Sequence, residues 1–354
     1  MSAQTLEQTL KQFTKEGELY KTEENDAIRC FACGHRCLIK AGRSGVCRVR
    51  YNEGGKLFVP FGYAGAIQCD PIEKKPFFHA YPGTDALSFG MLGCDFHCGY
   101  CQNWLTSQAL RDPKSTAPPA PTNAEELLAL AKRFGARTIA STYNEPLITS
   151  EWAVHIFKLA KKEKFATAYI SNGNGTPEVL DYIRPWVDLY KIDLKSFNDK
   201  CYRELGGVLD NVLSTVRQVY QKGFWLEIVT LIVPGFNDSD AELTQMAEFL
   251  ASVSPDIPWH VTAFHKDYRM TDPDNTSVET LLRAAAIGEK SGLRYVYAGN
   301  IPGKVGEYEN TRCPNCKETL VRRFGFQILS NRIKNGCCSK CSTAIPGIWN
   351  QSDY

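Results

Sequence analysis

Three cysteines lie within eight consecutive positions of MLGCDFHCGYCQNW, residues 91–104: Cys94, Cys98 and Cys101. Cys98 and Cys101 have the C-x-x-C spacing of thiol oxidoreductases. With His97, the three thiolates could instead hold zinc, or alone they could hold a [4Fe–4S] cluster whose fourth iron stays open. A redox pair of Cys98 and Cys101 would leave Cys94 without a role. Because His97 and Cys98 are adjacent in the chain, they are poorly placed to bind the same tetrahedral zinc ion. The spacing therefore favours the cluster.

Two further cysteine groups flank this motif in a chain with 14 cysteines among 354 residues. In a reducing compartment such groups indicate metal ligation rather than disulfides. The C-terminal group has the paired C-x2-C spacing of a zinc ribbon, with Cys337 as an alternative to Cys338. The N-terminal group predicts a second structural zinc or an auxiliary iron–sulfur cluster. The N-terminal cysteine group is Cys30, Cys33, Cys37 and Cys47, and the C-terminal cysteine group is Cys313, Cys316, Cys338 and Cys341.

Composition narrows the class of protein. With 43% hydrophobic and 23% charged residues the chain is an ordinary globular sequence. Its formal net charge of +2 gives little support to a nucleic-acid binder. No apolar run approaches the roughly 18 residues of a membrane span, and the polar start of the chain lacks the apolar core of a secretory signal. We therefore expect a cytoplasmic protein without nucleic-acid or membrane partners.

Strand-like and helix-like segments alternate between the two flanking cysteine groups. A strand at 85–92 ends at the three-cysteine motif, a helix over 123–135 and a strand over 137–142 follow, and a strand at 293–298 closes the series. The strands are β-branched and aromatic runs, as expected for a parallel sheet covered on both faces. Six or seven β/α units in one series predict an α/β fold, a partial (β/α)6–7 TIM-like barrel.

Four parts follow from this pattern. We expect an amphipathic N-terminal segment, where Leu6, Leu10 and Phe13 recur at helical spacing, then a Cys-rich extension, the barrel, and a zinc-ribbon-like extension. Their expected ranges are 1–27, 28–84, 85–300 and 301–354.

Reactive groups of a parallel barrel lie at the carboxyl ends of its strands. In this chain YNEP at 143–146, SNGNG at 171–175 and DLK at 193–195 follow the second, third and fourth strands, and His260 lies in the sixth. EKK at 73–75 could ring an anionic substrate or partner. Polar residues thus meet the cysteine motif on one rim, which indicates an active site.

The three-cysteine motif, with Tyr100 before its last cysteine, resembles the radical S-adenosyl-L-methionine (SAM) superfamily, and CQN at 101–103 resembles its branch containing pyruvate formate-lyase activating enzyme. Several spaced segments resemble, more closely, the AmmeMemoRadiSam-system radical SAM enzyme family. These are DPIEKKPFFHAYPG (70–83), GCDFHCGYCQNW (93–104), TYNEP (142–146), YVYAGNIPG (295–303) and the CPNC…CSKC…GIW tail (313–349).

The resemblance implies a radical SAM barrel in which a [4Fe–4S] cluster reductively cleaves SAM to a 5′-deoxyadenosyl radical that abstracts hydrogen from an unidentified substrate. It assigns Cys94, Cys98 and Cys101 to the cluster and gives His260 a catalytic place near SAM or substrate. It implies SAM-binding roles for Tyr100, Asn103, Asn144, Glu145, Asn172, Asp193 and Lys195.

The resemblance also implies partners: a one-electron reductant such as ferredoxin or flavodoxin, and Memo-like and AMMECR-like proteins. One alternative is a glycyl-radical-enzyme activating enzyme that acts on a protein backbone. Ile170 weakens that alternative, because activating enzymes carry an aspartate two residues before the asparagine of this segment. A second alternative is a non-catalytic metal or electron-transfer module.

Each assignment has a structural alternative. Asn144 and Glu145 could form a turn that caps the next helix. Lys195 could belong to a solvated surface pair. A single histidine in a strand, such as His260, is more often a structural residue than a catalytic one.

Overall fold

The computed structural model describes residues 5–115 and 117–349. Its centre is an eight-stranded sheet in which the strand order is β16-β15-β14-β13-β12-β11-β9-β8. All neighbours from β9 to β16 pair in parallel, whereas β8 pairs antiparallel with β9 at one edge. The bounds are β8 Ala66–Pro71, β9 Asp85–Gly90, β11 Thr138–Ser141, β12 Ala166–Ser171, β13 Leu189–Asp193, β14 Trp225–Ile232, β15 Trp259–Ala263 and β16 Val296–Gly299.

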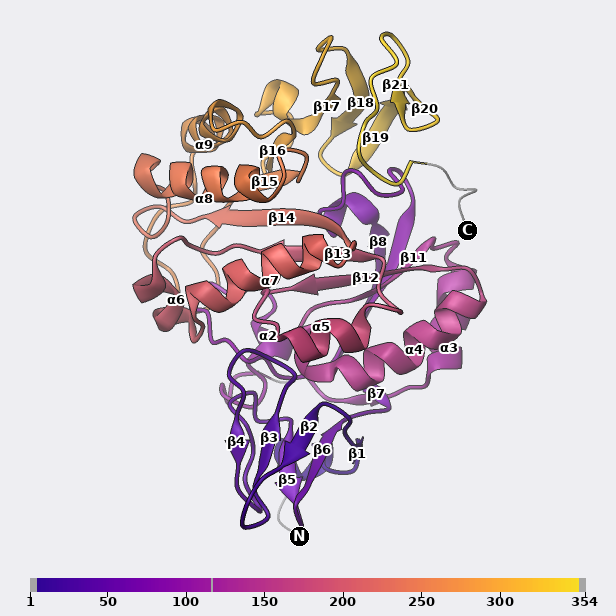
Figure 1. Cartoon of the computed structure of the whole chain (residues 1–354), viewed down its shortest axis with the longest axis vertical. Coiled ribbons are helices and arrows are strands. Elements are labelled where there is room, and N and C mark those ends of the chain that lie inside the picture. The colour runs from indigo at the N-terminus through magenta and orange to yellow at the C-terminus, as the bar shows by residue number, and fades with distance from the viewer. Residues whose placement is uncertain (1–4, 116, 350–354) are drawn as a thin grey trace.

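Helices connect the parallel strands and cover the outer face of the sheet (Figure 1). In α3, Asn123 and Glu126 form a reciprocal capping box, which explains why the helix begins where the sequence predicts. The helices are α2 Trp104–Ser107, α3 Ala124–Arg133, η2 Pro146–Thr149, α4 Ser150–Lys162, α5 Pro177–Ile183, α6 Asp199–Leu205, α7 Leu209–Gln221, α8 Asp240–Val253 and α9 Val278–Lys290.

The parallel β/α series confirms the predicted α/β architecture, but the sheet does not close. In the described part of the chain, β16 and β8 are the two edges and no ladder joins them. The chain segment that follows β8 fills the amino-terminal end of the curved sheet instead. There Phe77 and Tyr81 pack against small residues of the strands, among them Ala86, Ala140 and Ala168. This packing occupies the end at which the parallel strands begin.

An N-terminal module of short strands lies at one end of the molecule (Figure 1). The sheets β1-β6-β5 and β2-β3-β4 build it. A buried ion pair between Arg50 and Glu151 of α4 attaches it to the barrel, with Nη1 to Oε2 at 2.7 Å and both side chains at most 1% exposed. Its elements are α1 Leu6–Leu10, β1 Thr14–Glu16, β2 Tyr20–Thr22, β3 Ile28–Cys30, β4 Leu38–Ile39, β5 Tyr51–Glu53, β6 Lys56–Pro60, β7 Tyr63–Ala64 and, paired with β7, β10 Ala120–Pro121; η1 Ile72–Lys74 instead lies in the segment that follows β8.

A C-terminal module lies at the opposite end (Figure 1). Arg323 is buried in its interface with the barrel and donates from Nη2 to the carbonyl of Phe78 at 2.8 Å. The backbone of Tyr81 donates to Ile348 O at 2.8 Å, so the end of the described chain is held against the segment that fills the barrel. The elements are η3 Gly306–Glu309, β17 Thr311–Arg312, β18 Thr319–Phe324, β19 Gln327–Asn331, β20 Ile333–Lys334 and β21 Cys337–Cys338.

Residues 1–4 and 350–354, which belong to the expected parts 1–27 and 301–354, lie outside the described residues. No helix in ranges 5–115 and 117–349 is long and apolar enough to cross a membrane.

Candidate active site

A cavity of about 410 Å³ opens at the carboxyl ends of the parallel strands. All ten residues that the sequence assigns to the cluster or to SAM line this one cavity, although they come from four separate segments. They are Cys94, Cys98, Tyr100, Cys101, Asn103, Asn144, Glu145, Asn172, Asp193 and Lys195. His260, the eleventh predicted residue, does not line it.

The loop from Cys94 to Cys101 follows β9 and presents its three cysteines to the cavity. The Cys94 sulfur accepts the backbone N–H of Phe96 at 3.4 Å, and the Cys101 sulfur lies 3.1 Å from Ser107 Oγ. His97 packs against Gly206 instead, and none of the described residues lining the cavity is a histidine. The site therefore offers three thiols without an imidazole, as a [4Fe–4S] cluster with one open iron requires.

The three thiols are buried in a polar pocket. Burial raises the pKa of Cys98 to about 12, and the ammonium of Lys195 opposes this rise. Burial also raises the pKa of Cys94, as do the nearby carboxylates of Asp95 and Glu145. Because only the thiolate binds a metal, a bound metal must supply the positive charge that offsets burial.

The second strand end brings YNEP to the cavity. Asn144 Oδ1 accepts the backbone N–H of Met91 at 2.9 Å and so ties this segment to the end of β9. Tyr143 has a left-handed backbone, with φ of 66°. A non-glycine residue in that region is strained, and such strain concentrates at functional sites.

Glu145 is 2% exposed and accepts three hydrogen bonds from the chain. Its donors are Ser171 Oγ at 2.7 Å, Asn172 N at 2.7 Å and Leu147 N at 3.1 Å. The last bond caps η2, so the predicted helix-capping turn is present and the same side chain also lines the cavity. Burial, followed by the charge of Asp95, raises the pKa of Glu145 to about 8.

Asp95 links the cysteine loop to the third strand end. Its two carboxylate oxygens accept the side-chain amides of Asn172 and Asn174, both at 2.8 Å. These bonds hold Asn172 of the SNGNG segment next to the residue that follows Cys94, which fixes the loop against β12.

The fourth strand end carries Asp193 between two lysines. Lys191 and Lys195 both donate to its carboxylate, the latter at 3.3 Å. Burial alone would raise the pKa of Asp193, but the two ammonium groups keep it below its ordinary value. The Lys195 side chain is only 16% exposed, so it is a cavity residue and not part of a solvated surface pair.

The Tyr100 hydroxyl is buried, and no hydrogen-bond partner for it exists among the described residues. A buried hydroxyl without a partner is costly, and a bound group with a polar atom would satisfy it. Three thiols, a charged cluster at Asp193 and this free hydroxyl together fit a cluster and a polar, charged cofactor such as SAM.

His260 lies inside the barrel beneath the cavity. Its Nε2 is 2.7 Å from Glu227 Oε2. The Glu227 carboxylate also accepts the backbone N–H groups of Phe78 and His79, both at 2.9 Å. The catalytic role of His260 stays a prediction, and its contacts are those of a structural residue.

Several lining residues have no assignment from the sequence. Lys191 and Thr262 lie two positions from Asp193 and His260, so strand alternation could have found them. Tyr143 and Lys75 lie together, with Lys75 Nζ 3.1 Å from the Tyr143 hydroxyl. Both belong to segments that the sequence singles out, YNEP at 143–146 and EKK at 73–75, but neither is assigned to the cluster or to SAM. Phe326 belongs to the β18–β19 turn, and no local signal predicts that this distant segment borders the site.

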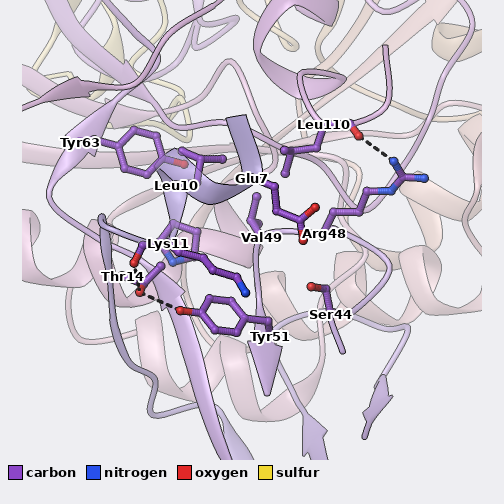
Figure 2. A pocket seen from close by; sticks show the side chains of 11 residues that line it. Glu7, Leu10, Lys11, Thr14, Ser44, Arg48, Val49, Tyr51, Tyr63 and Leu110 are labelled. Carbon is purple, nitrogen blue, oxygen red and sulfur yellow. Dashed lines mark hydrogen bonds between the residues drawn. The ribbon is translucent and has the colours of Figure 1, made fainter. Parts of the chain in front are cut away.

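A second hollow, between α1 and the strands of the N-terminal module, is too small for a ligand (Figure 2). Its volume is about 20 Å³, close to what one water molecule needs. Polar groups that line the hollow already have hydrogen-bond partners. Thr14 Oγ1 lies 3.1 Å from the Tyr51 hydroxyl, and Arg48 donates to Leu110 O at 2.6 Å.

The C-terminal cysteine group forms a candidate metal centre. The four sulfur atoms of Cys313, Cys316, Cys338 and Cys341 all lie within 4.8 Å of one another. The pairs Cys313–Cys341 and Cys316–Cys338 are 3.5 Å and 3.6 Å apart. Of the two adjacent cysteines, Cys338 is the one in the set, and Cys337 is not.

A β/α fold with a three-cysteine loop after its first parallel strand is the arrangement of radical SAM proteins. A sequence profile of the Radical SAM superfamily matches residues 90–250, and the chain belongs to this superfamily. Members of the superfamily are enzymes that use a [4Fe–4S] cluster, SAM and a one-electron reductant.

Several individual proteins are similar to the chain. A protein of Methanocaldococcus jannaschii described as uncharacterized is 35% identical over 335 residues, which cover 94% of this chain and 98% of that protein. Pyruvate formate-lyase 1-activating enzyme of Escherichia coli is 24% identical over 236 residues, 61% of this chain and 93% of the enzyme. A crystal structure of a domain of pyruvate-formate lyase-activating enzyme from Bacteroides vulgatus is 24% identical, with a TM-score of 0.40, and the match covers 46% of this chain and 98% of that domain.

Proposed function

We propose that the cavity holds a [4Fe–4S] cluster on Cys94, Cys98 and Cys101 with SAM beside it, and that the enzyme removes a hydrogen atom from a substrate still to be identified. The observation that carries this proposal is the convergence of all ten predicted cluster and SAM residues on one cavity. When bound and reduced by one electron, the cluster and SAM supply a 5′-deoxyadenosyl radical.

The chain's own residues bind SAM and orient it. Asp193 and Lys195 offer a carboxylate and an ammonium for the charged ends of SAM. Glu145 and Asn144 hold the end of the second strand in place to receive the amino group of SAM. Tyr100 offers its ring and its free hydroxyl to the adenosine of SAM. The barrel wall excludes water and competing hydrogen donors from a reactive intermediate.

A second candidate is an activating enzyme for a glycyl radical enzyme. The similarity to pyruvate formate-lyase 1-activating enzyme over 61% of this chain favours it. Ile170 lines the cavity where activating enzymes carry an aspartate, which argues against a cation site there. A substrate-derived radical on a partner protein's backbone, detected by electron paramagnetic resonance (EPR), would identify this activity.

We further propose membership of the AmmeMemoRadiSam-system family, with Memo-like and AMMECR-like partner proteins, ferredoxin or flavodoxin as the reductant, and a cytoplasmic location. The motifs at 70–83, 142–146 and 295–303 support the family assignment. The division into 1–27, 28–84, 85–300 and 301–354 belongs to the same proposal, as does structural zinc at the C-terminal cysteine group.

The test is anaerobic reconstitution with iron and sulfide, followed by reduction in the presence of SAM. We expect 5′-deoxyadenosine and methionine from the wild type and none from Cys98→Ala. Glu145→Gln should keep its iron but bind SAM at least about tenfold more weakly, whereas Asp240→Asn, at an exposed pair with Arg283, should behave as wild type. Absence of 5′-deoxyadenosine, with Cys98→Ala indistinguishable from wild type, would establish the non-catalytic metal module instead.

A further inference from the structure

The N-terminal cysteine group is gathered at one place beside the active site. Cys30, Cys33 and Cys47 are buried and Cys37 is half-buried, and all four are free thiols. The backbone N–H of Cys30 donates to Cys37 O at 3.0 Å, and a Cβ atom on Gly45, two residues before Cys47, would lie 3.4 Å from Cys37 Sγ. The chain from residue 30 to 47 thus folds back on itself and gathers its cysteines.

The sulfur atoms of this group already accept hydrogen bonds. Arg50 Nε donates to Cys30 Sγ at 3.3 Å, and the backbone N–H of Val46 donates to Cys37 Sγ at 3.5 Å. The active-site sulfur of Cys94 accepts a backbone N–H in the same way. Such N–H···S bonds stabilise metal-bound thiolates and tune iron–sulfur clusters.

The spacing of the sulfur atoms distinguishes the C-terminal cysteine group from the other two groups. A single tetrahedral zinc with bonds of about 2.3 Å holds its thiolates about 3.8 Å apart, and the C-terminal group is contracted to such spacing. A [4Fe–4S] cluster binds each thiolate on a different iron and so holds them farther apart. Within ranges 5–115 and 117–349 the C-terminal group is the only one whose ligand atoms all come within 4.8 Å. Neither the N-terminal group nor the active-site cysteines are contracted to this zinc-type spacing.

We propose that Cys30, Cys33, Cys37 and Cys47 bind a second [4Fe–4S] cluster. With four thiolates this cluster has no open iron, so its chemistry is electron transfer and not substrate binding. It accepts one electron from a one-electron reductant protein and passes that electron to the cluster on Cys94, Cys98 and Cys101, with no bond made or broken. The binding site itself does not depend on the proposed activity.

The contacts between the two groups support such a path. His35, between Cys33 and Cys37, has its Nε2 3.2 Å from the carbonyl oxygen of Asp95, the residue after Cys94. The backbone N–H of Gly34 donates to Asn174 O at 2.8 Å, and Asn174 in turn donates to the Asp95 carboxylate. Two short bonded links thus join the N-terminal group to the cysteine loop.

Three variants of the full chain, reconstituted without oxygen, test the proposal through iron, sulfide and zinc contents and EPR. Wild type should hold about eight irons per chain, and the triple variant Cys94→Ala/Cys98→Ala/Cys101→Ala about four, with a reduced-cluster signal that SAM does not alter. Cys30→Ser/Cys33→Ser should keep about four irons and a signal that SAM does alter. Cys313→Ser/Cys316→Ser should keep all its iron.

Zinc content and circular dichroism of the triple variant report whether it is folded. A folded triple variant without iron, or a second zinc in the wild type that Cys30→Ser/Cys33→Ser removes, would overturn the proposal. Failure of SAM cleavage in a protein with about eight irons would refute the proposed activity alone and leave the second cluster in place.

Discussion

Gly90, the last residue of β9, lies where the ends of β9 and β11 pack closely together in the active site. A Cβ atom at this position would overlap the carbonyl oxygen of Thr142 and lie 2.8 Å from the Cβ of Tyr143. Since the neighbour is backbone, it cannot rotate away, and the YNEP segment would have to move.

We therefore predict that Gly90→Ala lowers the free energy of unfolding by about 1–3 kcal/mol and weakens SAM binding. Chemical denaturation and equilibrium binding to the reconstituted protein measure the two effects. Gly299→Ala is the matched control, because its Cβ would meet only Thr262 Cγ2, at an ordinary 3.4 Å. Equal stability of the two variants would show that the strand ends can separate freely.

At the scale of elements, four of the five cysteines of the C-terminal module form one group, and Cys337 lies outside it. We predict that Cys338→Ser removes one zinc per chain and lowers the melting temperature, whereas Cys337→Ser keeps both, because only Cys338 belongs to the contracted group. Zinc analysis of the purified variants measures this directly. Loss of zinc from Cys337→Ser with retention in Cys338→Ser would reverse the ligand assignment.

The junction of the N-terminal module with α4 rests on a buried charge pair. Arg50 donates to both carboxylate oxygens of Glu151, at 2.7 Å and 2.8 Å, and to Ile148 O at 3.0 Å. Removing one partner leaves the other charge buried and unpaired, which is more costly than removing both.

We expect Glu151→Leu to reduce the free energy of unfolding by about 3–5 kcal/mol and Arg50→Met/Glu151→Leu to recover at least half of that loss. Lys56→Met, which breaks an exposed pair with Glu16, should change it by less than about 1 kcal/mol. Urea denaturation compares the four proteins. If Glu151→Leu is as stable as Lys56→Met, the junction does not depend on this pair.

At the scale of the whole molecule, His79 joins the barrel to the C-terminal module. Its Nδ1 lies 2.6 Å from Pro346 O and its Nε2 lies 2.6 Å from the Tyr297 hydroxyl. A carbonyl only accepts, so Nδ1 carries the proton and Nε2 accepts from Tyr297. These two hydrogen bonds require the neutral imidazole. Burial favours the same form and lowers the pKa of His79 to about 4.

Because the folded pKa of about 4 lies below the unfolded value of 6.5, this contribution to stability is complete above pH 6.5 and is lost as pH falls towards 4. The loss amounts to about 3 kcal/mol. Thermal unfolding of wild type and His79→Gln across pH 4 to 7 should show the difference in stability between them shrinking on acidification. A constant difference across that range would contradict the role of His79.

Local sequence patterns predicted much of the fold and of the candidate active site. Apolar periodicity and buried strand runs predicted α3 and the parallel strands, because both signals are set by neighbours in the chain. The three-cysteine spacing and the polar strand ends likewise predicted which side chains share a cavity, since the carboxyl ends of parallel strands meet on one rim.

The sequence by itself determined the class of fold, the cysteine loop and ten of the residues that line the cavity. Only the tertiary structure decided that the sheet stays open, that Phe326 borders the site, that His260 bonds to Glu227 beneath it, and that Cys338 rather than Cys337 joins the C-terminal group. The physical reason is that each of these depends on which segments far apart in the chain pack together. Spacing and periodicity record only near neighbours, whereas contact between distant segments is settled by burial and hydrogen bonding in the folded chain.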